Sequence, residues 1–89
     1  MDAIVKLGLA NGGRFRITGG YRVRNLTVRS AHPLVLTLFK NGVETALKAD
    51  NQRQSDPDVE VVCAVGDVLE FRTTPPADEG ASCEMDLLQ

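Results

Sequence analysis

The chain has 89 residues, 43% of them hydrophobic, and its 10 Lys and Arg against 12 Asp and Glu give a formal net charge of −2. This length predicts one domain, 1–89, which buries only about 60–65% of the surface that its unfolded chain exposes. The composition excludes a disordered chain, and no apolar run approaches the ~18 residues of a membrane span. Three Phe, one Tyr and no Trp leave little for an aromatic platform that stacks bases. A core this small favours assembly with partner subunits.

The charges are unevenly distributed along the chain. Residues 1–44 carry seven Lys and Arg against two acids, whereas residues 45–89 carry three against ten. One interpretation is that the two halves neutralise each other inside one domain, and a second is complementarity between neighbouring copies. Nucleic-acid binding is the weakest interpretation, because the acidic half would repel phosphate.

Apolar residues alternate with polar residues throughout the chain, and no helical period extends over a useful length. This alternation predicts strands at 3–9, 14–18, 21–30, 34–40, 43–49, 59–65, 68–74 and 81–88. Asn41-Gly42 is a strong hairpin signal, and Gly66-Asp67 predicts a second turn. Eight short strands at this spacing predict an all-β fold, a small antiparallel β-sandwich or jelly roll.

Two strands have special patterns. In residues 21–30 the apolar phase changes parity after Val23, which predicts a β-bulge near Asn25. In residues 34–40 both parities are rich in apolar side chains, so this strand is expected to be buried on both faces. Residues 50–58, which follow Ala49 and include no apolar residue, are expected to form the longest loop.

Cys63 and Cys83 both fall on inward-facing strand positions. Two buried thiols that pack as small apolar residues are the expectation for a protein made in the cytoplasm, where thiols stay reduced. A disulfide between Cys63 and Cys83 is the alternative, and it requires neighbouring Cβ positions.

No catalytic, cofactor or metal site is predicted. His32 is the single histidine and has no nucleophile or second ligand near it in the sequence. The acidic pairs Asp56/Asp58 and Asp78/Glu79 lack the spacing of a calcium loop, and the glycine pairs lead into no phosphate-binding motif. The chain is therefore interpreted as a non-enzyme.

The segment VLTLFKNGVETALKAD at 35–50, followed by VEVVCAVGDVLEFRTT at 59–74, resembles the later half of a known kind of jelly roll. It is similar to complement C1q-like and tumour-necrosis-factor-like domains, in which an NG hairpin and a GD turn recur and the domain forms trimers. It also resembles the trimeric decoration, or cement, proteins of tailed bacteriophages. The resemblance covers about half of the chain, which is shorter and poorer in aromatic residues than the animal domains and has no secretion signal.

The resemblance implies a structural virion protein, a homotrimer that is made in the host cytoplasm and decorates the capsid surface by binding between subunits of the major capsid protein. The residues expected to bind the partner are Val5, Leu7, Arg14, Arg16, Arg22 and Arg24. Those expected at the trimer contact are Val35, Phe39 and Leu88. No nucleic acid, membrane or cofactor enters this hypothesis.

Two alternatives belong to other classes. A receptor- or carbohydrate-binding module of a tail fibre would use the loops 50–58 and 74–80. A cupin-like enzyme shares the jelly-roll fold but needs a cluster of His ligands, and this chain has one His.

Overall fold

The computed structural model describes residues 3–10 and 13–89, with side chains from 3–10 and 16–89. Every predicted strand is present, with ends within two residues of the expected ones. The strands are β1 (Ala3–Gly8), β2 (Gly13–Arg16), β3 (Tyr21–Arg29), β4 (Val35–Lys40), β5 (Val43–Asp50), β6 (Glu60–Cys63), β7 (Val68–Thr74) and β8 (Ser82–Leu88).

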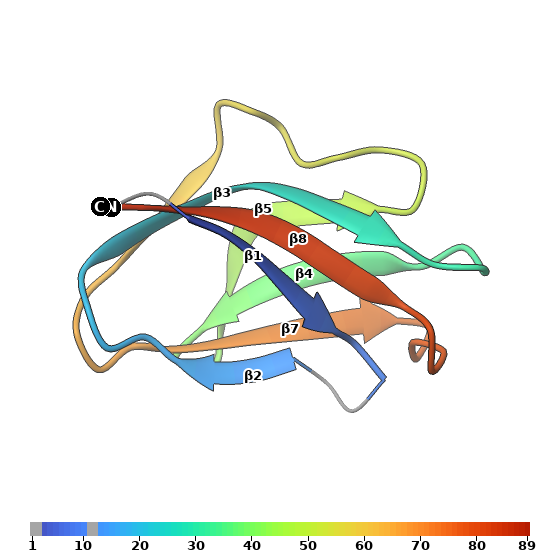
Figure 1. Cartoon of the computed structure of the whole chain (residues 1–89), viewed down its shortest axis with the longest axis horizontal. Coiled ribbons are helices and arrows are strands. Elements are labelled where there is room, and N and C mark those ends of the chain that lie inside the picture. Colours follow the sequence, from blue (N-terminus) through green and yellow to red (C-terminus); the bar gives the residue numbers. More distant parts are fainter. Residues whose placement is uncertain (1–2, 11–12) are drawn as a thin grey trace.

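The strands form two four-stranded antiparallel sheets, in the orders β1-β8-β3-β6 and β2-β7-β4-β5. The two sheets pack face to face (Figure 1). Each sheet alternates strands from the two ends of the chain, so the polypeptide wraps around itself, and this order is that of a jelly roll. The predicted fold class is confirmed.

One continuous core fills the space between the sheets. Its members alternate along each strand, as period-2 patterning requires, and the largest fully buried side chains include Phe71, Leu36, Leu38, Leu69 and Met85. Burial of these side chains contributes roughly 1.5–3 kcal/mol each. The predicted inward positions of Cys63 and Cys83 are also confirmed.

The predicted bulge in β3 is confirmed at Asn25. Asn25 has a positive φ of 56°, and the pairing of β3 with β8 shifts register between Arg24 and Thr27. The extra residue lets Val23 and Leu26, three positions apart, both point into the core with no exposed surface. The Asn25 amide also donates a hydrogen bond of 2.6 Å to the Asp86 carboxylate on β8.

The expectation that β4 is buried on both faces is wrong. Leu34, Leu36 and Leu38 are buried, but Val35 is 44% exposed and Phe39 is only half-buried. The outer face of β4 has no third layer over it, so its apolar residues face outward. The guanidinium of Arg72, on β7, stacks 4.0 Å from the Phe39 ring centroid and covers part of that ring.

Ser55, a buried polar residue, anchors the long loop between β5 and β6 to the core. The Ser55 hydroxyl accepts a hydrogen bond of 2.9 Å from the Leu26 N–H, and the Ser55 N–H donates to the Leu26 carbonyl at 2.9 Å. This pair continues the edge of β3 beyond the end of β6.

At the opposite end of the sandwich, hydrogen bonds of Asn41 and Asp67 link the β4–β5 turn, the β6–β7 turn and the β2–β3 connection to one another. The Asn41 amide donates to Asp67 at 2.9 Å and accepts from the Val68 N–H at 2.9 Å, while Asp67 also accepts from the Ala64 N–H at 2.8 Å. The Ile17 N–H donates to the Asp67 carbonyl. The Asn41 hydrogen bond, followed by the Ala64 hydrogen bond, lowers the pKa of Asp67 from its ordinary 3.8.

Replacing Ser55 by Ala should lower the free energy of unfolding by about 1–3 kcal/mol, because the buried Leu26 N–H loses its acceptor. Gln54→Ala, at the exposed neighbouring position, should change it by less than about 0.5 kcal/mol. Urea denaturation followed by circular dichroism measures both values. Equal stability of the two variants would contradict the anchoring role of Ser55.

The Asp67 carboxylate should stabilise the fold above its unfolded pKa, and this contribution should be lost as the pH falls through the lower pKa of the folded state. Asn41→Gly keeps the positive φ of the turn but removes the amide, so the pKa of Asp67 should rise toward 3.8. Carboxyl-carbon NMR titration measures the change. Asn51→Gly, at the opposite end of the sandwich, is the control that should leave it unchanged, and an unmoved Asp67 pKa in Asn41→Gly would refute the assignment.

Candidate binding surface at strand β1

Strand β1 has the least protected edge of the two sheets. It pairs with β8 through six consecutive residues without a register shift, and its other side has no strand neighbour in the described chain. The edge strands β2 and β6 have only four residues each, and β5 carries a bulge against β4. Short length and bulges are the usual protections of an edge. β1 is neither short nor bulged, and Lys6 is the one charged residue between Ala3 and Gly8.

A groove lies beside this edge, on the outer face of the sheet. Ile4, Asp86 and Arg24 stand in one cross-strand row, and Ala3 and Leu88 complete the lining. The groove has a volume of about 330 Å³, and Ile4 at its rim is 74% exposed. The Arg24 Nε is buried without a hydrogen-bond partner among the described residues. The groove therefore combines an apolar rim with an incompletely paired guanidinium.

The two residues of β1 that were expected to bind the partner do not face the groove. Val5 and Leu7 pair with Met85 and Cys83 and pack against the core. Their side chains point away from the outer face, so they stabilise the sheet and do not present themselves to a partner. Ile4, on the opposite parity, is the exposed apolar residue of this strand.

The predicted row of arginines is divided between the two sheets. Arg22 and Arg24 belong to β3, whereas Arg14 and Arg16 belong to β2 in the other sheet. Arg22 forms an ion pair of 3.6 Å with Glu60 on β6. The four arginines expected to bind the partner therefore belong to both sheets, because the chain crosses from one sheet to the other between residues 16 and 21.

The three residues expected at the trimer contact also do not form one patch. Val35 and Phe39 lie on the outer face of β2-β7-β4-β5, whereas Leu88 lies in the groove on the outer face of the other sheet. Leu88 is 7% exposed and stands apart from the main core. The three residues therefore form no single patch on one subunit.

Cys63 and Cys83 are both free and buried thiols. Cys63 lies opposite Tyr21 and Cys83 lies opposite Val28, so β3 separates them and the offset along β3 is roughly 20 Å. Disulfide partners need Cα atoms within about 7 Å. The alternative of a Cys63–Cys83 disulfide within the chain is therefore wrong, and the two residues pack as small apolar side chains.

The loops at one end of the sandwich come together without forming a reactive centre. His32 is exposed and forms an ion pair of 3.1 Å with Asp78 of the β7–β8 loop. Asp50 and Asp56 cap their own turns by accepting hydrogen bonds from Gln52 and Asp58. Residues 3–10 and 13–89 hold no group of three or more His, Cys, Asp or Glu that could bind a metal ion. Nor do they hold a helix long and apolar enough to cross a membrane.

Sequence reasoning missed Ile4 as a surface residue. The alternation of residues 3–9 placed Val5 and Leu7 on one face and Lys6 on the other, and Ile4 shares the Lys6 parity. An apolar residue on the polar parity of a terminal strand was the available signal, because such a side chain has no place in the core.

No protein-family model matches the chain, and no curated protein matches it in sequence. The functional argument therefore depends on the geometry of the molecule.

Both thiols should resist modification in the folded protein. Burial raises the pKa of the Cys83 thiol to about 11 and also raises the pKa of Cys63, so little of the reactive thiolate exists at pH 8. Iodoacetamide labelling followed by mass spectrometry should show slow native labelling and two rapid additions in guanidinium chloride. Native labelling of Cys83 at the rate of free cysteine would contradict its burial.

Proposed function

We propose that this chain is a structural virion protein that decorates and stabilises a bacteriophage capsid by binding between coat subunits. The observation that carries the proposal is the unprotected edge of β1, with Ile4 exposed beside it. Exposed, regular, weakly charged edges are sites at which another chain adds a strand. The jelly-roll order of the strands agrees with the resemblance to trimeric decoration proteins.

A strand of the coat protein would pair with the free edge of β1 through backbone hydrogen bonds. The groove would supply side-chain contacts, with Ile4 and Leu88 receiving apolar residues and the Arg24 guanidinium receiving an acidic side chain. A protein that binds only the assembled shell stabilises that shell by mass action. Three linked copies at a three-fold position would add avidity without any new contact.

Self-association is a separate part of the proposal. A cyclic trimer joins two different surfaces of each subunit, so its contact residues need not lie in one patch. Val35 and Phe39 on one sheet are exposed or half-exposed apolar residues that a neighbouring copy would cover. Leu88, on the other sheet, belongs to the groove and is assigned to the coat contact.

The alternative is a receptor- or carbohydrate-binding module of a tail fibre. The observation in its favour is the ordered loop end, where the ion pair between His32 and Asp78 joins the β3–β4 and β7–β8 loops. Loops held on a rigid sandwich are common binding sites. The edge of β1 favours the decoration function, because it fits a partner that offers a strand.

Ile4→Lys should abolish binding to assembled shells of the virus that encodes the chain, because a charge at the edge opposes strand addition. A point substitution is sharper than removal of residues 1–9, which would also remove the buried Leu9 and a strand of the sheet. Cosedimentation of the variant with shells measures the loss.

Val62→Lys is the matched control, since Val62 is 63% exposed on β6 in the same sheet. It should bind like the parent protein. Light scattering should give both variants the parent's solution mass, with or without reductant, and the expected mass is that of a trimer. Normal shell binding by Ile4→Lys would overturn the assignment of β1, and a strictly monomeric parent would remove the trimer.

A further inference from the structure

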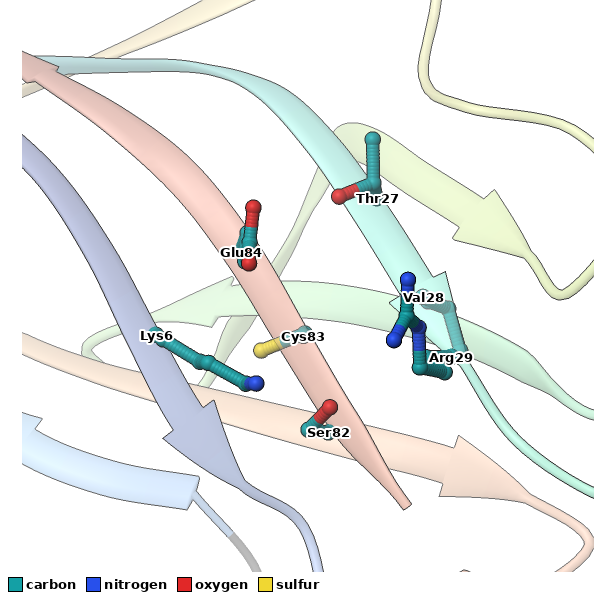
Figure 2. Close-up of a pocket in the computed structure, with 7 residues that line it drawn as sticks. All are labelled: Lys6, Thr27, Val28, Arg29, Ser82, Cys83 and Glu84. Atoms are coloured by element: carbon teal, nitrogen blue, oxygen red, sulfur yellow. The ribbon is translucent and has the colours of Figure 1, made fainter.

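A second hollow lies on the same outer face as the β1 groove but at the other end of the strands. It has a volume of about 160 Å³ and is lined by Lys6, Thr27, Val28, Arg29, Ser82, Cys83 and Glu84. Figure 2 shows that these residues come from the three neighbouring strands β1, β8 and β3. Lys6 belongs to β1, whose free edge is the proposed coat contact, whereas the other lining residues lie on β3 and β8.

The hollow exists because small residues occupy one cross-strand row. Gly8 pairs with Ser82, and Ser82 pairs with Arg29. A Cβ atom placed on Gly8 would have no heavy atom within 4 Å. The absence of a side chain at Gly8 and the short side chain of Ser82 leave open space between longer neighbours.

Two cations approach this space from opposite sides. Lys6 reaches toward β8 from β1, and Arg29 reaches toward it from β3, with Ser82 between them (Figure 2). Neither cation forms an ion pair with another residue in the described part of the chain. Converging cations without internal partners favour a bound anion, and a guanidinium is suited to a carboxylate.

The remaining polar groups restrict which anion fits. Glu84 stands in the adjacent row between Lys6 and Thr27, and its carboxylate can only accept hydrogen bonds. It therefore disfavours a small bare anion and favours a ligand that also donates hydroxyl groups. The hydroxyls of Ser82 and Thr27 can donate to such a ligand or accept from it.

We propose that this hollow binds a sugar acid, that is, a ligand carrying one carboxylate and several hydroxyl groups on a single ring. Lys6 and Arg29 hold the carboxylate, and Glu84, Ser82 and Thr27 bind the ring hydroxyls. The volume is below the roughly 300–1,000 Å³ of pockets for drug-sized ligands, which limits the site to one monosaccharide unit. The proposal does not depend on capsid binding, because the purified chain contains the whole site.

The test is an amide NMR titration of the purified protein with sodium glucuronate, glucose and sodium acetate at constant ionic strength. Glucuronate should shift the amides of Lys6, Arg29, Ser82 and Glu84 with a Kd on the order of 1 mM. Glucose lacks the carboxylate and acetate lacks the hydroxyls, so each should bind at least about fivefold more weakly. Acetate shifts equal to those of glucuronate, or no saturable shifts, would overturn the proposal.

Three variants examine the assigned roles. Lys6→Gln and Arg29→Gln should each weaken glucuronate binding by about twofold to fivefold, as expected for an exposed charged contact. Ser82→Leu should abolish it, because a larger side chain at this lining position fills the hollow without changing any charge. Lys48→Gln, on β5 in the other sheet, is the control that should leave binding unchanged, and an equal loss in Lys48→Gln would indicate only general charge attraction.

A second arm identifies the source of the sugar acid. The methyl glycoside of glucuronate has a substituted anomeric oxygen, as a unit within a polysaccharide does. It should bind as tightly as glucuronate if the natural ligand is an acidic polysaccharide, and more weakly if the natural ligand is a free sugar acid. Unchanged spectra outside the hollow establish that each variant is folded.

Discussion

The β-bulge at Asn25 is the constraint on which the arrangement of the outer surface depends. β3 pairs with both β8 and β6, so its side-chain parity decides what faces the core across most of that sheet. If β3 alternated regularly through Asn25 without a bulge, Leu26 would point outward and Arg29 would point into the core, where an unpaired charge costs far more than an apolar side chain contributes. With it, Arg24 faces outward beside the β1 groove before the bulge, and Arg29 faces outward beside the second hollow after it. Asn25 suits this position because asparagine tolerates a positive φ.

The four edge strands of the sandwich differ in how they are protected against pairing with another chain. Two edge strands are short, and the third is bulged against its neighbour and carries Glu44 and Lys48. The Ser55 pair with Leu26 further occupies the edge of β3 that β6 does not reach. The edge of β1 differs from the other three, because it is regular and has none of these protections.

Strand positions and parity could be predicted from the sequence because period-2 burial is a local property of the pattern. The eight strands, the bulge at Asn25 and the Asn41-Gly42 turn all follow from it. The expectations that were wrong concern how segments far apart in the sequence are arranged relative to one another. Nothing in the pattern says whether a third layer covers β4, and nothing in residues 14–24 shows that a sheet boundary divides the arginines. The buried role of Ser55 depends on a partner 29 residues away along the chain, and the second hollow depends on a cross-strand row contributed by three strands.

The uneven charge distribution is explained by the topology itself. A jelly roll pairs strands from the first half of the chain with strands from the second half, as in β1 with β8, β2 with β7, and β3 with β6 and β8. A basic first half and an acidic second half therefore bring opposite charges onto neighbouring strands, as in the ion pair between Arg22 and Glu60. Cross-strand pairs of opposite charge stabilise a sheet by roughly 0.2–1 kcal/mol each. The asymmetry thus brings at least one pair of opposite charges onto neighbouring strands within one chain. Lys6 and Arg29 depart from this arrangement, since both remain without an ion pair in the described chain although Glu84 lies directly opposite Lys6 and one row from Arg29. Cations that the internal charge pairing leaves unmatched, at the rim of a hollow, are the ones available to a ligand.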